Sequence, residues 1–149
     1  MPLDQPANAR VLAALARLGP GKPEVMRHDA VPDAYLRCGC HPDIVERLWD
    51  QLGPALPQDC RLLIYGTPAL AHASGLILAL GMGTRYALRI PPSCIQAAKD
   101  AGADTINTWS GGGRMDIQVD YGEDWIFGSW LALESTWCRA VYEACAPVR

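Results

Sequence analysis

Residues 61–90 of the chain, RLLIYGTPALAHASGLILALGMGTRYALRI, carry the pattern that decides the fold. The apolar run at 61–65, which a glycine closes, is typical of a short buried strand. A second apolar run at 76–80 leads into the glycines of 81–83, which permit a tight reversal because glycine adopts positive φ at little cost. Apolar side chains then alternate with Ala and Arg over 86–90, which predicts the strand that completes a hairpin.

Downstream of this hairpin the pattern predicts a helix, two strands and a final helix. The helix begins in the Pro-Pro-Ser sequence at 91–93 and ends at Gly102, a residue type favoured after the last helical turn. Strands are expected over 105–109 and 115–121, and the second of these alternates apolar and polar residues throughout. Such alternation fits an antiparallel sheet with one dry face and one wet face. The final helix is expected over 131–145.

The first part of the chain predicts two helices separated by a break. Asn8 stands where it can cap the first helix. Gly19-Pro20-Gly21-Lys22-Pro23 interrupts regular structure and is typical of a hinge or linker. Pro42 suits the start of the second helix, where its missing N–H is not needed. We therefore expect an N-terminal helix with a Gly/Pro hinge over 1–23 and a single domain over 24–149.

The predicted order of elements is ααβββαββα, with the strands grouped together. This grouping predicts the α+β class, with an antiparallel sheet of about five strands and helices packed on one side of it. The length of 149 residues suits one domain. Half of the residues are hydrophobic and 19% are charged, so the composition provides for a buried core.

Charge and hydropathy argue against two classes of partner. The 13 Lys and Arg residues against 16 Asp and Glu residues leave a net charge of −3, whereas a sequence-independent nucleic-acid binder needs a basic face. The most apolar segment, 75–83, is about half as long as the roughly 18 residues that suggest a membrane span. The sequence starts without the basic residues and apolar stretch of a signal peptide. We therefore expect a cytoplasmic protein without membrane or nucleic-acid contacts, in which the six cysteines are reduced and mostly structural.

Four short motifs follow one another along the chain. They are Tyr65-Gly66-Thr67-Pro68-Ala69 after a strand, Tyr86-Ala87-Leu88-Arg89-Ile90-Pro91 at the end of the hairpin, Ala101-Gly102-Ala103 at the end of a helix and Gly113-Arg114-Met115 at the start of a strand. With them, the layout of residues 42–146 resembles the TfoX N-terminal domain and MmcQ/YjbR-like families of small bacterial proteins. The resemblance implies a bacterial α+β protein that is a compact regulatory or binding module more than an enzyme. It supplies no catalytic residue.

The densest group of metal-binding residue types is Cys38-Gly39-Cys40-His41. Two thiolates and an imidazole this close can contribute to a tetrahedral zinc site, for which the fourth ligand would be His28, Cys60 or a thiol from elsewhere in the chain. The spacing differs from that of zinc fingers, where two or more residues separate the first cysteines. The alternative is a glycine turn into the helix at Pro42, with His41 near its N-cap.

Tryptophan is unusually frequent, with five tryptophans against one phenylalanine, and several aromatics gather before the final helix. Trp125, Phe127 and Trp130 lie in the short segment 122–130, which carries no regular pattern. One interpretation is an exposed aromatic patch of the kind enriched at protein interfaces. The other is a small core that packs this segment onto the sheet.

Three further residues are candidates for contacts with a ligand or partner. Arg114 ends the glycine-rich loop at 110–114 and can bind an anion, although the loop lacks the lysine and the following helix of a phosphate-binding loop. His72 and Tyr65 stand at the ends of neighbouring predicted strands, with Arg89 on a third, so that the three could converge. His72 lacks the flanking glycines of a nucleophile elbow, which favours a turn residue over a catalytic one.

The leading hypothesis is a non-enzymatic intracellular binding or regulatory module that acts through protein–protein contacts, with a partner protein or as a homodimer. Its contacts are predicted at Trp125, Phe127, Trp130, Arg114, Tyr65 and His72. The alternative is a thiol or zinc-binding protein that uses the Cys38-Gly39-Cys40-His41 cluster. Apart from that zinc, no cofactor is expected.

Overall fold

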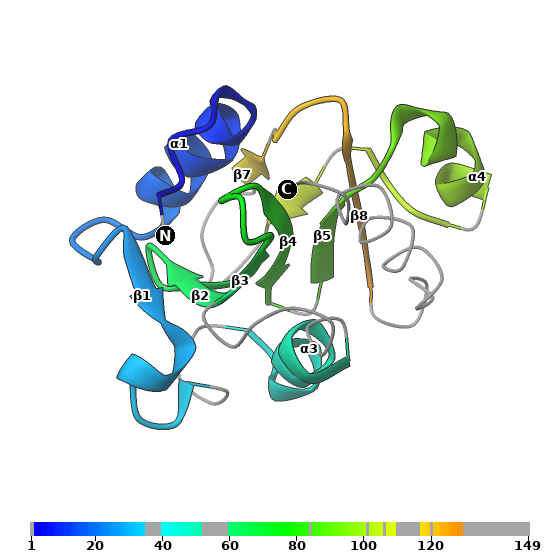
Figure 1. Cartoon of the computed structure of the whole chain (residues 1–149). Helices are drawn as coiled ribbons and strands as arrows, with labels where there is room; N and C mark the ends of the chain where they lie inside the picture. The colour runs from blue at the N-terminus through cyan, green and yellow to red at the C-terminus, as the bar shows by residue number, and fades with distance from the viewer. Residues whose placement is uncertain are drawn as a thin grey trace.

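A six-stranded antiparallel sheet lies at the centre of the molecule (Figure 1). The computed structural model describes residues 2–34, 40–51, 60–83, 85–100, 102–105, 107–109, 117–119 and 121–129. The strand order is β1-β2-β3-β4-β5-β8, and each neighbouring pair is antiparallel. The strands are β1 (Val25–Arg27), β2 (Arg61–Ile64), β3 (Thr67–Ala71), β4 (Ile77–Met82), β5 (Arg85–Arg89) and β8 (Trp125–Ser129).

The central strands β2 to β5 follow one another along the chain as hairpins. The β2–β3 hairpin turns at Tyr65 and Gly66, whose φ angles are 48° and 80°. Positive φ at both central residues is the turn geometry that matches the right-handed twist of the two strands. The Tyr65 N–H also donates to the carbonyl oxygens of Pro23 and Glu24, at 3.1 and 3.0 Å, and this holds β1 beside β2.

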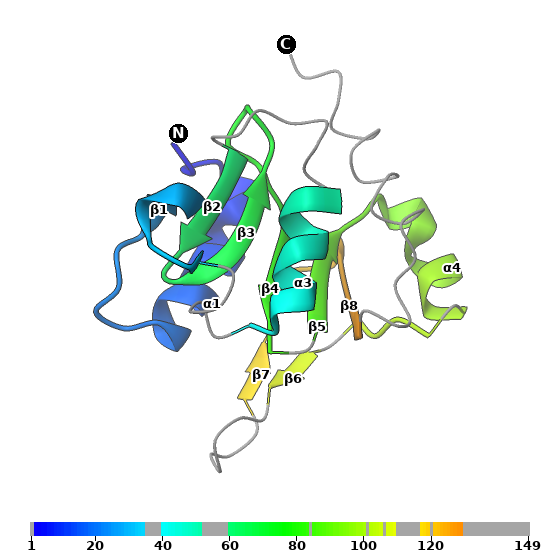
Figure 2. The ribbon, with the colours of Figure 1, turned by 90° about the horizontal axis from the view of Figure 1, so that it is seen from below.

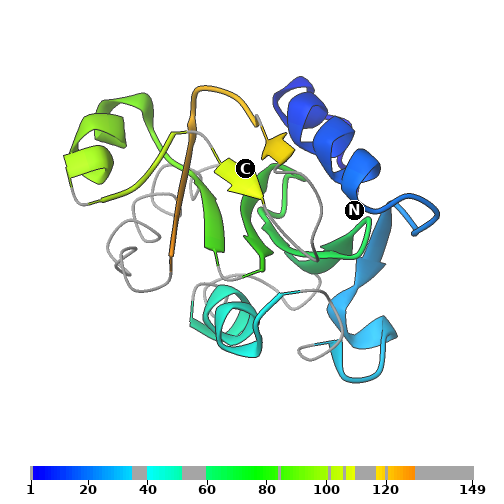
Figure 3. The same ribbon diagram turned by 180° about the vertical axis from the view of Figure 1, so that it is seen from behind.

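Helices cover both faces of the sheet rather than one (Figures 1 and 3). The helix α1 packs on one face through Val11 and Leu15. The helix α3 lies across the central strands on the other face (Figure 2), and Ala98 of α4 belongs to the same apolar cluster. None of the helices in the described residues has the length and apolar character needed to cross a bilayer. The helices and helical turns are η1 (Pro6–Asn8), α1 (Ala9–Leu18), η2 (His28–Ala30), α3 (Pro42–Glu46), η3 (Arg47–Gln51), η5 (Pro92–Cys94) and α4 (Ile95–Asp100).

The central strands are apolar on both sides, which is why both faces need a cover. In β2, Leu62 and Ile64 belong to the core under α1, and Leu63 between them belongs to the core under α3. A strand that is buried on both faces reads as a continuous apolar run, as 61–65 does. Alternation of the kind seen at 115–121 instead predicts cover on one side only.

The α+β class and the antiparallel sheet are confirmed, with six strands in place of about five. The strands β2 and β4 lie where apolar runs predict them and β5 where alternation predicts it, whereas β1, β3 and β8 were not predicted. The predicted strands at 105–109 and 115–121 contain β6 (Asn107–Trp109) and β7 (Ile117–Val119), which pair in a separate two-stranded sheet. The predicted final helix at 131–145 lies outside the described residues.

Candidate functional site

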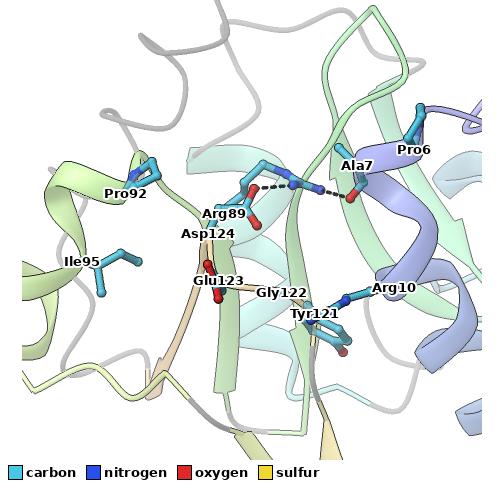
Figure 4. A pocket seen from close by; sticks show the side chains of 10 residues that line it. All are labelled: Pro6, Ala7, Arg10, Arg89, Pro92, Ile95, Tyr121, Gly122, Glu123 and Asp124. Carbon is cyan, nitrogen blue, oxygen red and sulfur yellow. Dashed lines mark hydrogen bonds and ion pairs between the residues drawn. The ribbon is translucent and has the colours of Figure 1, made fainter.

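A buried arginine joins three distant segments at one end of the sheet. Arg89 on β5 is only 7% exposed. Its Nε donates to the carbonyl oxygen of Ile77 at 2.8 Å. Its Nη1 donates to Oδ2 of Asp124 at 2.6 Å and its Nη2 to the carbonyl oxygen of Ala7 at 3.3 Å (Figure 4). The guanidinium carbon also lies 4.8 Å from the centre of the Trp125 ring, a cation–π distance. Arg89 thus ties η1, β4 and the turn before β8 together.

Asn8 performs a similar role beside it. Asn8 is the N-cap residue of α1, as the sequence predicts, but its side chain makes no capping hydrogen bond. The Asn8 Nδ2 instead donates to the carbonyl oxygens of Leu3 and Gly75, at 3.1 and 2.8 Å, and its Oδ1 accepts from the N–H of Ile77 at 3.0 Å. This fully buried amide therefore anchors the N-terminal segment to the β3–β4 connection.

A cleft of about 680 Å³ opens beside the Arg89–Asp124 ion pair. Residues of η1 and α1 line one side and residues of η5 and α4 line the other, with the ion pair between them (Figure 4). The volume falls within the range of roughly 300–1,000 Å³ that is usual for small-molecule sites. Arg10 and Glu123 add one charge of each sign, so the charges of the lining balance. Four of the five N–H donors of Arg89 already bond to protein oxygens. The main role of this guanidinium is therefore to stabilise the fold and not to bind a ligand.

The cleft also contains a buried phenol. Tyr121 is 2% exposed, and burial raises the pKa of its hydroxyl above the ordinary value. The ring centre lies 5.4 Å from those of Trp125 and Phe127, and the hydroxyl has no hydrogen-bond partner among the described residues. A phenol held neutral in this way supplies no acid–base group near neutral pH.

The aromatic segment before the final helix is largely core. Trp125 and Phe127 are 0% and 1% exposed, because they belong to β8 and point into the cluster under α1. The hypothesis of an exposed aromatic patch is therefore wrong for these two residues, and the alternative of a core is confirmed. Trp130 and Arg114 lie outside the described residues.

The predicted convergence of Tyr65, His72 and Arg89 does not occur. Tyr65 precedes β3 and His72 follows it, so the two lie at opposite ends of this strand. Only His72 shares a sheet end with Arg89. His72 is 7% exposed, and its Nδ1 lies 3.0 Å from Oγ of Ser74 and accepts the N–H of the same residue at 3.1 Å. His72 is therefore a turn residue, as its sequence context favours.

The two described residues of the cysteine–histidine cluster, Cys40 and His41, lie in different surroundings. Cys40 is 7% exposed and packs in the core under α3, whereas the His41 side chain is 49% exposed. His41 is the N-cap of α3, and its Nδ1 accepts the N–H of Asp43 at 3.2 Å, which confirms the turn interpretation for this residue. Cys38 lies outside the described residues, and the described ranges hold no group of three or more metal-binding side chains.

The two edges of the sheet differ in how they are covered. On β8, Phe127 exchanges two hydrogen bonds of 2.8 Å with Asp104, which covers the middle of that edge. On β1, the Tyr65 N–H donates to the Glu24 carbonyl, so the backbone groups of Glu24 face β2. Because successive residues of an antiparallel strand alternate in direction, Val25 and Arg27 direct their N–H and C=O groups away from β2. No described residue bonds to these outward groups, and β1 lies at the outer margin of the molecule (Figures 1 and 3).

A small apolar hollow adjoins β1 on the face that α3 covers. Its volume is about 170 Å³, and Met26, Val31, Ala34 and Leu63 give it apolar walls. Pro23, Gly66 and Lys22 complete the lining.

Lys22 is the charged group of this hollow. Its stem crosses Gly66 so closely that a Cβ on the glycine would lie 2.5 Å from Cδ and 2.9 Å from Nζ of the lysine. The ammonium forms no ion pair with any described residue. The Gly/Pro pattern of residues 19–23 predicts a linker around Lys22, and no local pattern marks β1, so neither the hollow nor the edge strand was predicted.

No protein family, curated protein or solved structure matches the chain. The resemblance to the TfoX N-terminal domain and MmcQ/YjbR-like families therefore stays a prediction.

Proposed function

We propose that the chain is a non-enzymatic binding module that recognises another protein by adding an extended segment of it to the outer edge of β1. The observation that carries the proposal is the unpaired edge itself. The N–H and C=O groups of Val25 and Arg27 point away from β2 and have no partner among the described residues. An unpaired edge of this kind is a template for strand addition, in which main-chain hydrogen bonds supply the affinity.

Natural sheets usually protect their edges with charges, prolines or covering loops. Here β8 is covered by Asp104, while β1 carries one charged side chain, Arg27, whose Nε and Nη2 each donate to an oxygen of the Asp29 carboxylate at 3.1 Å. Both side chains are about half exposed, and a surface ion pair contributes about 1 kcal/mol or less, so an arriving strand can displace it. The protein-contact function predicted from the sequence is thus retained, but its location moves from 122–130 to β1.

The first experiment is a selection of random peptides displayed on phage against the immobilised full-length chain. We expect peptides with β-forming residues to be enriched over a bare surface. A synthetic copy of an enriched peptide should shift the backbone amide resonances of Val25 and Arg27 in NMR spectra. Failure to enrich any peptide, or shifts confined to other elements, would contradict the proposal.

Two variants of one residue separate the backbone from the side chain. Arg27→Pro removes an outward N–H, which an edge strand tolerates, and Arg27→Ala keeps it. With a hydrogen bond worth about 1 kcal/mol, we expect Arg27→Pro to weaken peptide binding about fivefold or more, by fluorescence anisotropy. Arg27→Ala should bind within about twofold of the parent chain, since only an exposed ion pair is lost. Equal effects of both variants would show that the peptide reads the side chain and not the edge.

A further inference from the structure

We infer that the segment bound at β1 carries one large apolar side chain that enters the hollow formed by Met26, Val31, Ala34 and Leu63, next to an acidic side chain that pairs with Lys22. The inference rests on the proposed function, because the edge must first hold the segment. It adds the chemistry by which a partner is selected.

The register of strand addition delivers side chains to this hollow. Successive side chains of a strand point to opposite faces, and directly opposed residues of two strands share a face. Met26 packs in the α3-face cluster, whereas Val25 packs against the α1-face cluster. A residue placed opposite Met26 by an added strand therefore projects to the face on which the hollow opens.

The size and lining of the hollow define the side chain that it accepts. Its volume of about 170 Å³ is close to the roughly 150 Å³ of a known apolar protein cavity that binds benzene. Five of its lining residues have apolar side chains, so a phenyl or a branched aliphatic group would move from water into apolar surroundings here. A small or polar side chain would leave the hollow empty or bury an unpaired polar group.

Lys22 supplies the second element of selection. Lys22 belongs to the lining of the hollow, its stem and ammonium cross Gly66 in the same lining, and the ammonium has no ionic partner among the described residues. A carboxylate beside the apolar anchor would complement this charge, and a lysine or arginine there would be repelled. The occupant that fits is thus an extended peptide segment with an apolar residue and a neighbouring acid.

Substitutions in the selected peptide and in the hollow test the anchor together. We expect the consensus of the peptides selected on the full-length chain to contain a large apolar residue and an acid. Replacing that apolar residue by alanine should weaken binding to the parent chain roughly tenfold to a hundredfold, the loss expected for one large buried side chain. In Ala34→Leu, which fills the hollow, the two peptides should bind with equal affinity. If Ala34→Leu does not fold, Val31→Phe provides a second test, because Val31 also lines the hollow and is only partly buried. In this variant too, the two peptides should bind with equal affinity.

The charge element is tested by Lys22→Glu. This variant should invert the preference between peptides with an acid and peptides with a lysine beside the anchor, by up to about fivefold each way as for exposed ion pairs. Lys99→Glu on α4 makes the same charge change far from β1 along the chain and should leave the preference unaltered.

The outcomes separate this inference from the proposed function. If peptides bind in a way that depends on the outward N–H of Arg27 but are indifferent to Ala34→Leu and Lys22→Glu, the edge function stands and the anchor inference is wrong. If no binding depends on that N–H, the proposed function fails with it. If sedimentation shows a dimer that Arg27→Pro dissociates and that peptides do not displace, a second copy occupies the edge and the inference of a partner peptide is overturned.

Discussion

Single polar residues in an apolar surrounding hold together parts of the chain that are far apart in sequence. Arg89 and Asn8 are both buried, and between them they bond to residues of the N-terminal segment, β4 and the turn before β8. Buried polar groups are tolerated only when hydrogen bonds replace their lost hydration, and these two meet that condition. The ion pair of Arg89 with Asp124, which borders the cleft, is part of this anchoring.

Asn8 provides a test of the difference between a helix cap and a tertiary anchor. We expect Asn8→Ala to lower the free energy of unfolding by about 2–3 kcal/mol, since it orphans the N–H of Ile77 and two buried carbonyls. Asn8→Ser keeps a good capping residue but is too short to reach these partners, so its loss should be nearly as large. A serine variant within about 0.5 kcal/mol of the parent in urea titrations would instead identify a simple cap.

Tyr121 should make the protein less stable at alkaline pH. The folded-state pKa of its phenol is raised by burial, whereas in the unfolded chain it stays near its ordinary value of about 10. Above that pH the unfolded chain loses a proton that the folded chain keeps, so the free energy of unfolding falls by up to about 1.4 kcal/mol per pH unit. Tyr121→Phe should remove this part of the decline and leave stability at neutral pH unchanged or higher, as measured by denaturant unfolding at a series of pH values. Identical pH profiles for the two chains would contradict the prediction.

Among the elements, local pattern predicts the strands that show a long apolar run or a clear alternation and misses those that are short or irregular. The strands β2 and β4 follow from apolar runs and β5 follows from alternation, because hydrophobic periodicity is encoded in neighbouring residues. The strand β1 is three residues long, and β8 reads WIFGS, with consecutive apolar residues that divide between the two cores. Their pairing partners β2 and β5 are distant in sequence, so only the assembled sheet identifies them as strands.

The assignment of β8 to the core leads to a clear prediction for Trp125. Trp125→Ala should cost about 3–5 kcal/mol of stability, the usual loss for a large aromatic removed from a packed core. Thermal or urea unfolding followed by circular dichroism would measure it. The exposed Arg17→Ala serves as the control and should change stability by less than about 0.5 kcal/mol. A Trp125→Ala chain of unchanged stability that loses a binding partner would restore the interface hypothesis.

In the molecule as a whole, the sheet separates two hydrophobic cores. One lies under α1 and the other under α3 and α4, and each takes alternate side chains of the same strands. The N-terminal helix is therefore the cover of one core as well as the neighbour of a Gly/Pro linker. Its removal would expose Ile64, Leu80 and other side chains of that face to water.

A chain that begins at residue 24 tests the predicted division between a helix with its hinge and the rest of the protein. We expect this chain not to form a stable native state, since it lacks Val11, Leu15 and the Asn8 anchor. The expected signs are poor dispersion of NMR amide resonances and binding of a hydrophobic dye. A well-dispersed spectrum like that of the parent would mean that residues 1–23 are a separable attachment.

Local sequence is enough to predict the α+β class, the hairpin of β4 and β5 and the turn roles of His72 and His41, because each depends on neighbours within a few residues. The tertiary structure was needed to establish that helices cover both faces, that Trp125 and Phe127 are core and that Arg89 and Asn8 are anchors. It was also needed to find that the outward groups of β1 have no partner among the described residues and lie beside an apolar hollow. These features depend on which distant segments meet. Asn8 meets Ile77, for example, across 69 positions of the chain. Such encounters follow from the packing of whole apolar faces, which no local pattern encodes.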